Sequence, residues 1–261
     1  MSHLNKIVNL NLHPINRSDE YLSVCRNKLK SNSLLQLDDF LLPKALKIIQ
    51  NEAKKLYCKS FHSSKNHTVL LYKKDNTLNN DDPCNIVVNS NKSCVPDDLI
   101  PYNSLIRLLY NSTNFRKFIE TVFGIDKIYP YRDTLASINY NYYGKNQQLG
   151  WHFDNAYFTI TLMIESPISG GIFQYINKVR DFDKNYINKN LLKSVLTNTH
   201  LVNELSVQSG TLVLFYGRNS LHRVTPVTSD KYRVLVTLNY NLEKNIMLSE
   251  NARLTFFGRL K

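Results

Sequence analysis

A chain of 261 residues that is 43% hydrophobic and 21% charged has the composition of a globular protein, large enough for one large domain or two small ones. No segment approaches the roughly eighteen consecutive apolar residues of a membrane-spanning helix, and the start of the chain lacks a signal-peptide core, so we expect a cytoplasmic protein without a membrane partner. The net charge of +12 comes from scattered Lys and Arg, which disfavours a nucleic-acid partner.

Helical patterns dominate the first half of the chain. Pro43 suits the first turn of a helix, and apolar residues follow it at helical spacing, namely Leu46, Ile49, Ala53 and Leu56. A second helix is predicted after Thr113, ending at Gly124, with one apolar face made of Phe115, Phe118, Ile119 and Val122. Between these helices the polar, Pro-containing stretch 76–98 is expected to be an exposed loop.

From about residue 134 the pattern changes to short strands separated by turns. Eight β-like segments follow one another, at 134–143, 151–154, 156–164, 170–176, 200–207, 211–217, 221–227 and 232–241. Eight antiparallel strands suit a jelly roll, a cupin-like double-stranded β-helix that closes around a pocket. The sequence therefore predicts a mainly β domain with some α structure over 1–261. A helical support region runs to about 130, the jelly-roll core covers about 131–245, and a C-terminal segment covers 246–261.

One charged, Asn-rich segment, roughly 177–199, interrupts these strands. A lid over the pocket mouth and a plain surface insertion are both consistent with its length. The four cysteines stand at irregular spacings without a Cys-x-x-Cys pair, so we expect free thiols rather than a zinc or redox motif. Only Cys84 and Cys94 are candidates for a bridge under oxidising conditions.

His152 and Asp154 stand two positions apart at the start of a predicted strand, so their side chains point to one face. An imidazole and a carboxylate on one face supply two of the three ligands of the two-histidine, one-carboxylate site of non-haem iron. The spacing alone is weak evidence, because a surface histidine beside a turn carboxylate gives the same pattern. A third ligand has to come from a distant strand. His222 is better placed for it than His200, which borders the 177–199 segment.

A 2-oxo acid cosubstrate would need a cationic side chain to bind the carboxylate that does not reach the iron. Three protein ligands on an octahedral iron leave two positions for a bidentate 2-oxo acid and one for dioxygen. The far carboxylate of 2-oxoglutarate favours a planar guanidinium over an ammonium. Arg233 begins the strand that follows His222 and is the candidate, the alternative being a surface arginine on an edge strand.

In this order, His152, Asp154, His222 and Arg233 resemble the iron(II)/2-oxoglutarate-dependent oxygenase superfamily. The closer resemblance is to the subgroup of free-amino-acid radical halogenases and related hydroxylases, carried by the segments at 151–175, 210–227 and 248–259. It implies Fe(II), 2-oxoglutarate and O2 as cofactor and cosubstrates. One departure is GGIFQY, which lacks the acidic residue expected after the glycines.

The resemblance also implies the reaction. Halogenases of the subgroup have a small residue, usually Gly, where Asp154 stands, which leaves an iron position for chloride. A carboxylate there implies a hydroxylase acting on an unactivated carbon of a small substrate, most simply a basic or aliphatic free amino acid. Two alternatives stay open: an oxygenase acting on a peptide or protein side chain or a nucleic acid, and a non-catalytic cupin-like binding protein.

Strand alternation suggests further contacts. If Arg233 faces the pocket, Thr237 and Asn239 share its face and are candidates to bind substrate, as is Asn155 beside Asp154. Asn139, in the first barrel strand, is a candidate contact for 2-oxoglutarate or substrate. For each, the alternative is a buried polar group satisfied by its protein neighbours. Arg223 should point away from the iron, because it follows His222 directly.

Overall fold

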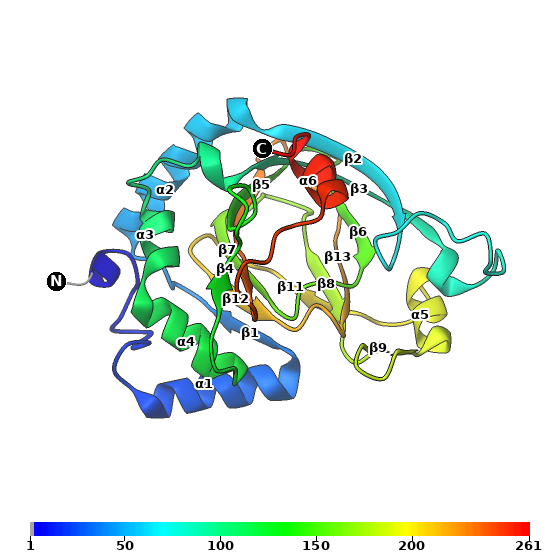
Figure 1. The fold of residues 1–261 in the computed structure, drawn as a ribbon, viewed down its shortest axis with the longest axis horizontal. Coiled ribbons are helices and arrows are strands. Elements are labelled where there is room, and N and C mark those ends of the chain that lie inside the picture. Colours follow the sequence, from blue (N-terminus) through cyan, green and yellow to red (C-terminus); the bar gives the residue numbers. More distant parts are fainter. Residues whose placement is uncertain (1–2) are drawn as a thin grey trace.

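The structure, a computed structural model, describes residues 3–261. Four helices pack together beside a large sheet (Figure 1): α1 (Asp19–Asn32), α2 (Pro43–Leu56), α3 (Leu105–Asn111) and α4 (Thr113–Phe123). Both predicted helices are confirmed. Pro43 is at the start of α2, and Gly124 ends α4 in the left-handed region at φ 68°.

The large sheet has seven antiparallel strands. In spatial order they are β1 (Leu34–Leu37), β12 (Leu212–Phe215), β7 (Thr159–Glu165), β14 (Arg233–Leu238), β5 (Ile138–Tyr143), β3 (Val87–Val95) and β2 (Phe61–Thr68). The small sheet orders β11 (Asn203–Leu205), β8 (Phe173–Ile176), β13 (Leu221–Val224) and β6 (Leu149–His152). Strands from all eight predicted segments are present, and the prediction of a jelly roll is confirmed.

The remaining elements are short. Two strand pairs join β4 (Tyr129–Pro130) to β15 (Tyr240–Asn241) and β9 (Arg180–Asp181) to β10 (Tyr186–Ile187). Helix α5 (Lys189–Leu196) lies beyond the small sheet, and α6 (Glu250–Phe257) packs against β2 and β3 near the C-terminus (Figure 1). Single 3-10 turns occur at His3–Lys6, Tyr57–Lys59, Pro83–Asn85 and Asp97–Leu99. In residues 3–261 we find no helix with the length and apolar character of a membrane span.

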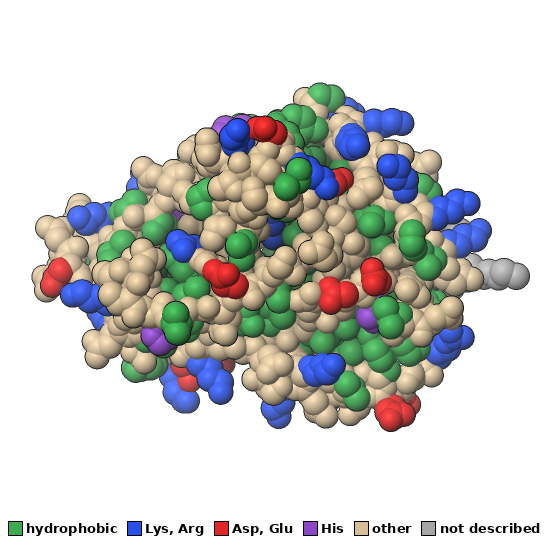
Figure 2. All heavy atoms as spheres, turned by 180° about the vertical axis from the view of Figure 1, so that it is seen from behind, with side chains coloured by type: hydrophobic (Ala, Val, Ile, Leu, Met, Phe, Trp, Pro, Cys, Tyr) green, Lys and Arg blue, Asp and Glu red, His purple; other side chains and the backbone are tan. Residues whose placement is uncertain are grey.

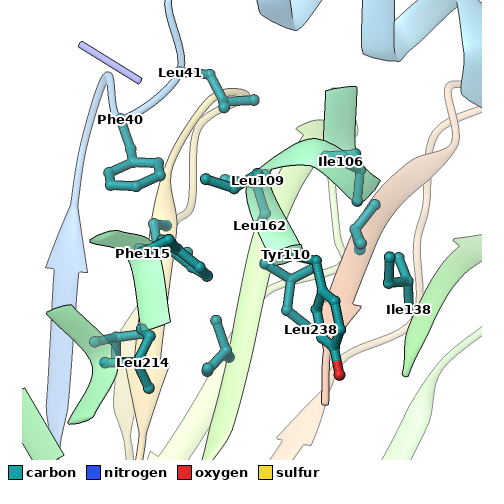
Figure 3. Close-up of a cluster of buried hydrophobic side chains, with 14 of the residues drawn as sticks. Phe40, Leu41, Ile106, Leu109, Tyr110, Phe115, Ile138, Leu162, Leu214 and Leu238 are labelled. Carbon is teal, nitrogen blue, oxygen red and sulfur yellow. The ribbon is translucent and has the colours of Figure 1, made fainter. Parts of the chain in front are cut away.

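The main core lies between the helices and one face of the large sheet (Figure 3). Leu162, Leu214 and Leu238 come from its strands and meet helix residues such as Leu109 and Phe115. Alternation along β14 sends Val234, Val236 and Leu238 into this core and leaves the intervening residues facing the small sheet. The space between the two sheets is therefore lined by one side of each strand.

The predicted loop at 76–98 is wrong over Val87–Val95, which form β3. This strand pairs with β2 along its whole length and with β5 over its last residues. Its middle is a run of Asn, Ser and Lys, residue types that are depleted in strands. Pairing with β2, together with a bridge from Asn91 to Gln148, supplies backbone hydrogen bonds to this run, so tertiary context overrides the local preference.

The distribution of charged side chains and the state of the cysteines agree with the expectations of scattered basic residues and free thiols. Figure 2 shows basic side chains mainly around the outline of one face, with acidic ones among them, rather than a continuous basic surface. All four cysteines are free thiols, three of them buried.

Candidate metal centre

Two neighbouring strands of the small sheet, β6 and β13, bring His152, Asp154 and His222 together. His152 ends β6 and is directly opposite His222 of β13, while Asp154 follows two residues after His152. The Nε2 atoms of both histidines lie 3.5 Å from Oδ1 of Asp154. One ligand atom from each of the three residues lies within 4.8 Å of the others, a cluster that could hold a metal ion.

Backbone carbonyls orient both imidazoles. Nδ1 of His152 is 2.8 Å from the Gly150 carbonyl oxygen, and Nδ1 of His222 is 3.0 Å from that of Ser220. A carbonyl oxygen can only accept, so each Nδ1 carries the proton and each Nε2 presents a lone pair to the cluster. This is the tautomer that metal coordination through Nε2 requires.

The electrostatics of the cluster also suit a cation. Burial, with a smaller effect of His222, lowers the pKa of His152 to about 4, against the opposing effect of Asp154. Burial alone would raise the pKa of Asp154, but His222 and His152 together hold it well below its usual range. A neutral imidazole and an ionised carboxylate are the protonation states in which these groups bind metals.

A second layer of residues supports the ligand strands. His67 of β2 contacts the Ser90 hydroxyl at 2.6 Å, and that hydroxyl accepts a hydrogen bond from the Gly150 backbone N–H at 2.9 Å. The His67 ring also lies edge-on to that of His152, with centroids 6.5 Å apart. This contact was not predicted from the sequence, because it depends on the pairing of β2, which contains His67, with β3, which contains Ser90.

The 177–199 segment packs behind the cluster of His152, Asp154 and His222. Leu192 and Val195 of α5 are buried with Phe153 and Leu221 in one cluster on the outer side of the small sheet. Arg180 donates from Nη2 to the Asp154 carbonyl oxygen at 2.9 Å. Of the two interpretations, these contacts favour an insertion that braces the ligand strands from outside over a lid.

Arg233 is almost fully buried, at 3% exposure. Its Nε and Nη1 have no hydrogen-bond partner among the described residues, and its guanidinium lies 5.4 Å from the Tyr143 ring centroid. Burial lowers its pKa. It lines a cavity of about 190 Å³ with polar residues that include Ser166 and Ser169. Unpartnered donors on a buried cation leave a place for a carboxylate, which fits 2-oxoglutarate.

Apolar side chains lie between the cavity at Arg233 and the cluster of His152, Asp154 and His222. Leu205 and Val207 line the cavity and also pack with Phe173 and Phe215. The rings of Phe173 and Phe215 lie 5.6 and 5.0 Å from the His222 ring, measured between centroids. Apolar and aromatic side chains therefore form the wall between the cation at Arg233 and the imidazole at His222.

The family model for Halogenase D matches residues 17–253. The chain belongs to the halogenase D family. No curated protein sequence matches it.

Solved structures of 2-oxoglutarate/iron oxygenases share its fold. A 2OG-Fe(II) oxygenase family oxidoreductase from Burkholderia pseudomallei aligns with a TM-score of 0.56 at 12% identity, covering 88% of this chain and 94% of the other. A Trichoplax adhaerens prolyl hydroxylase, in complex with a hypoxia inducible factor oxygen degradation domain peptide, aligns at 0.57 and 16% identity over 90% and 94%. The epimerase SnoN, in complex with Fe3+ and alpha ketoglutarate, aligns at 0.56 and 10% identity over 86% and 84%.

Family and fold together make this halogenase D family member an enzyme, an oxidoreductase of the 2-oxoglutarate/iron(II) class. Iron and 2-oxoglutarate are the cofactor and cosubstrate of that class. The two-histidine, one-carboxylate donor set suits non-haem iron(II).

The other site residues predicted for this family member lie on or near the inner face of the large sheet, the face toward the small sheet. Asn139 donates from Nδ2 to the carbonyl oxygens of Leu135 (2.6 Å) and Ile138 (2.8 Å), and its Oδ1 accepts from Nδ2 of Asn239 at 3.1 Å. Asn239 also donates to the Ala136 carbonyl oxygen at 2.7 Å. Asn139 and Asn239 are thus satisfied by protein neighbours, and their ligand contacts stay predictions.

Thr237 and Asn155 have fewer internal partners. The Thr237 hydroxyl accepts two long hydrogen bonds, each of 3.4 Å, from Nδ2 of Asn141 and Nδ2 of Asn239. Asn155 is exposed, and its carbonyl oxygen accepts from Nη2 of Arg218 at 2.7 Å. Arg223 points away from the cluster, as predicted: it stacks 4.7 Å from the Trp151 ring centroid and donates to Gln174 at 2.6 Å.

Lys92 lies on the same face of the large sheet as Asn141 and was not among the residues predicted from the sequence. In the β3–β5 register Cys94 pairs with Asn141, so Lys92 lies on the same face, and its Nζ donates to Oδ1 of Asn141 at 2.5 Å. The ammonium also lies 5.6 Å from the ring centroid of Phe256, in α6. Once Val87–Val95 was expected to be a loop, alternation could not be applied to it.

Proposed function

We propose that the chain is an iron(II)- and 2-oxoglutarate-dependent dioxygenase that hydroxylates an unactivated carbon of a free amino acid. His152, Asp154 and His222 would hold the iron, and Arg233 the far carboxylate of 2-oxoglutarate. The observation that carries the proposal is the convergence of two Nε2 atoms on one carboxylate oxygen. Iron bound with 2-oxoglutarate supplies the oxidation of a C–H bond by O2, with release of succinate and CO2.

The protein's own share is to hold and orient. The carbonyls of Gly150 and Ser220 hold the imidazoles in the tautomer that binds metal. The guanidinium of Arg233 would pair with a carboxylate in the cavity that it lines, where its donors lack other partners. The rings of Phe173 and Phe215 pack beside His222 and shield its imidazole, which is buried, from solvent.

Hydroxylation rather than halogenation rests on Asp154. Its carboxylate points at both imidazoles and occupies the position that a chloride ligand would need. Although the family is named for halogenases, this chain keeps a protein ligand there. Transfer of an oxygen atom to the substrate is the outcome that this donor set supports.

A free amino acid is supported by the inner face near Lys92. Its ammonium, with Asn141 and Thr237, forms a polar group that suits a substrate carboxylate. Phe256 of α6 lies beside the ammonium, and α6 packs over β2 and β3 (Figure 1). A helix in this position favours a small substrate, with Asn155, Thr237 and Asn239 as further contacts and Asn139 supporting them.

A peptide substrate is the second candidate. One structure of similar fold is a prolyl hydroxylase in complex with a peptide fragment. The family model spans most of the chain, and we propose that residues 1–261 act as one catalytic domain on either substrate. The cytoplasmic location expected from the sequence stays a prediction.

Succinate release in the presence of Fe(II), 2-oxoglutarate and O2 tests the proposal, with a panel of amino acids beside proline-containing peptides. We expect at least one basic or aliphatic amino acid to stimulate release above the substrate-free rate, and His152→Ala to abolish it. Stimulation by peptides alone would replace the free amino acid by a peptide. No release under any condition would overturn the dioxygenase itself.

A further inference from the structure

We infer that Thr159 and Gly217 position Asp154 so that it offers a metal one oxygen and only one. The inference rests on the proposed function, since it concerns the same cluster. The two oxygens of Asp154 have different surroundings. Oδ1 lies 3.5 Å from both imidazole Nε2 atoms, whereas Oδ2 accepts a hydrogen bond from the Thr159 hydroxyl at 2.5 Å.

Thr159 holds Oδ2 from a rigid support. It is the first residue of β7, where it pairs with Phe215 of β12, and β7 lies inside the large sheet between β12 and β14. Its hydroxyl proton points to the carboxylate, because an ionised carboxylate can only accept. A charge-assisted hydrogen bond of this kind is short and strong, so it fixes the rotation of the Asp154 carboxylate.

Gly217 makes the space for that rotation. A Cβ at position 217 would lie 1.9 Å from Oδ2 of Asp154 and 2.7 Å from its Cγ. The Gly217 carbonyl oxygen also accepts the Asp154 backbone N–H at 3.1 Å. Gly217 is not among the glycines with positive φ. A glycine is needed here because of the neighbouring carboxylate, and not because of an unusual backbone conformation.

The consequence is a defined number of protein bonds to the metal. With Oδ2 held by Thr159 and pressed against Gly217, Asp154 supplies Oδ1 alone, and two imidazoles bring the protein ligands to three. An octahedral metal then keeps three positions for a bidentate 2-oxo acid and O2. A carboxylate free to rotate could bind through both oxygens and take one of these positions.

Metal binding tests the role of Thr159 without turnover. Co(II) or Mn(II) would be titrated anaerobically into the metal-free protein and into Thr159→Val, Thr159→Ser and Thr161→Val. Loss of an outer hydrogen bond to a ligand lowers metal affinity about 10- to 100-fold, so we expect that loss in Thr159→Val. Thr159→Ser should restore affinity, and Thr161→Val, two residues along the same face, should match the unchanged chain.

Each outcome has one meaning. If the unchanged chain binds neither metal, the proposed function fails. If it binds and Thr159→Val binds equally well, the inference for Thr159 is overturned while the proposed function stands. If Thr161→Val weakens binding as much as Thr159→Val, the effect belongs to the strand, and the inference is again overturned.

Thermal unfolding tests Gly217 in a double-mutant cycle on the metal-free protein. Gly217→Ala should lower the Tm by several degrees when Asp154 is present, because the new Cβ displaces the carboxylate. In an Asp154→Gly background the same change should leave the Tm nearly unchanged, since no side chain is left to displace. An equal loss in both backgrounds would assign Gly217 a general structural role and overturn its part in the inference.

Discussion

His152 and His222 are direct partners on neighbouring antiparallel strands, with ring centroids 4.1 Å apart. Facing residues of such a pair have the closest side chains in a sheet. Two imidazoles reach one carboxylate because β6 and β13 pair in this register. A shift by one residue would send one ring to the outer face, where Trp151 and Leu221 are buried.

The first prediction concerns the third ligand. His222→Ala should abolish substrate-stimulated succinate release and lower Co(II) affinity by at least about 10-fold, since a ligand loss is more severe than loss of an outer-layer contact. His200→Ala is the matched control, because His200 is exposed and outside the cluster. Equal effects of the two changes would remove His222 from the metal site.

The second prediction concerns the cosubstrate anchor. Arg233→Lys should raise the KM for 2-oxoglutarate about 10- to 100-fold, because charge-assisted hydrogen bonds contribute about 1.5–3 kcal/mol and an ammonium cannot reproduce the planar fork. Arg223→Lys on the outer face of β13 should leave this KM unchanged. Steady-state kinetics with varied 2-oxoglutarate make the comparison, and an unchanged KM in Arg233→Lys would contradict the assignment.

The third prediction separates substrate from cosubstrate. Lys92→Met keeps the unbranched chain up to the position of Cε and removes the charged ammonium, so the KM for the amino acid should rise about 10-fold or more while the KM for 2-oxoglutarate stays the same. Lys65→Met, at an exposed position of β2, serves as control. If Lys92→Met changes only the KM for 2-oxoglutarate, Lys92 binds the cosubstrate instead.

Stability of the metal-free protein should depend on pH through His152. Its pKa is lowered in the folded state from 6.5 to about 4, so the folded protein disfavours its protonation. The stabilising contribution is present above pH 6.5 and is lost as the pH falls from there to about 4, amounting to about 3 kcal/mol.

Denaturant unfolding between pH 7.5 and 4.5 measures this loss. His152→Gln should reduce the loss of stability over that range, because Gln does not titrate, while His13 and Asp97, whose pKa values are also shifted by burial, still contribute. Asp154, whose pKa is held below its usual range, loses its own contribution only at lower pH. An equally steep decline in His152→Gln would show that other groups cause it.

The residues of the candidate metal cluster and Arg233 could be selected from the sequence because each depends on local pattern. His152 and Asp154 share a strand face by spacing alone, and His222 and Arg233 begin or lie in apolar strands whose alternation is clear. His222 was preferred over His200 because His200 borders the 177–199 segment, and the resemblance to a known superfamily then rested on the four residues together. Strand positions in the jelly roll followed from the same alternation.

Gly217, Thr159 and Lys92 could not be predicted from the sequence, because their roles depend on contacts between strands. The role of Gly217 exists only because its backbone passes the Asp154 carboxylate, and that of Thr159 because its hydroxyl reaches the same group. Lys92 lies in a strand whose polar run carries no β signal. Contacts made across strands depend on register, which sequence pattern alone does not set for polar strands.

The most direct measurement is the mass of the product formed from a stimulating amino acid with Fe(II), 2-oxoglutarate and O2 in chloride-containing buffer. We predict a product that has gained one oxygen atom and no chlorine, formed together with succinate, and absent in Asp154→Ala. A chlorinated product, or turnover that persists unchanged in Asp154→Ala, would contradict an iron centre held by His152, Asp154 and His222.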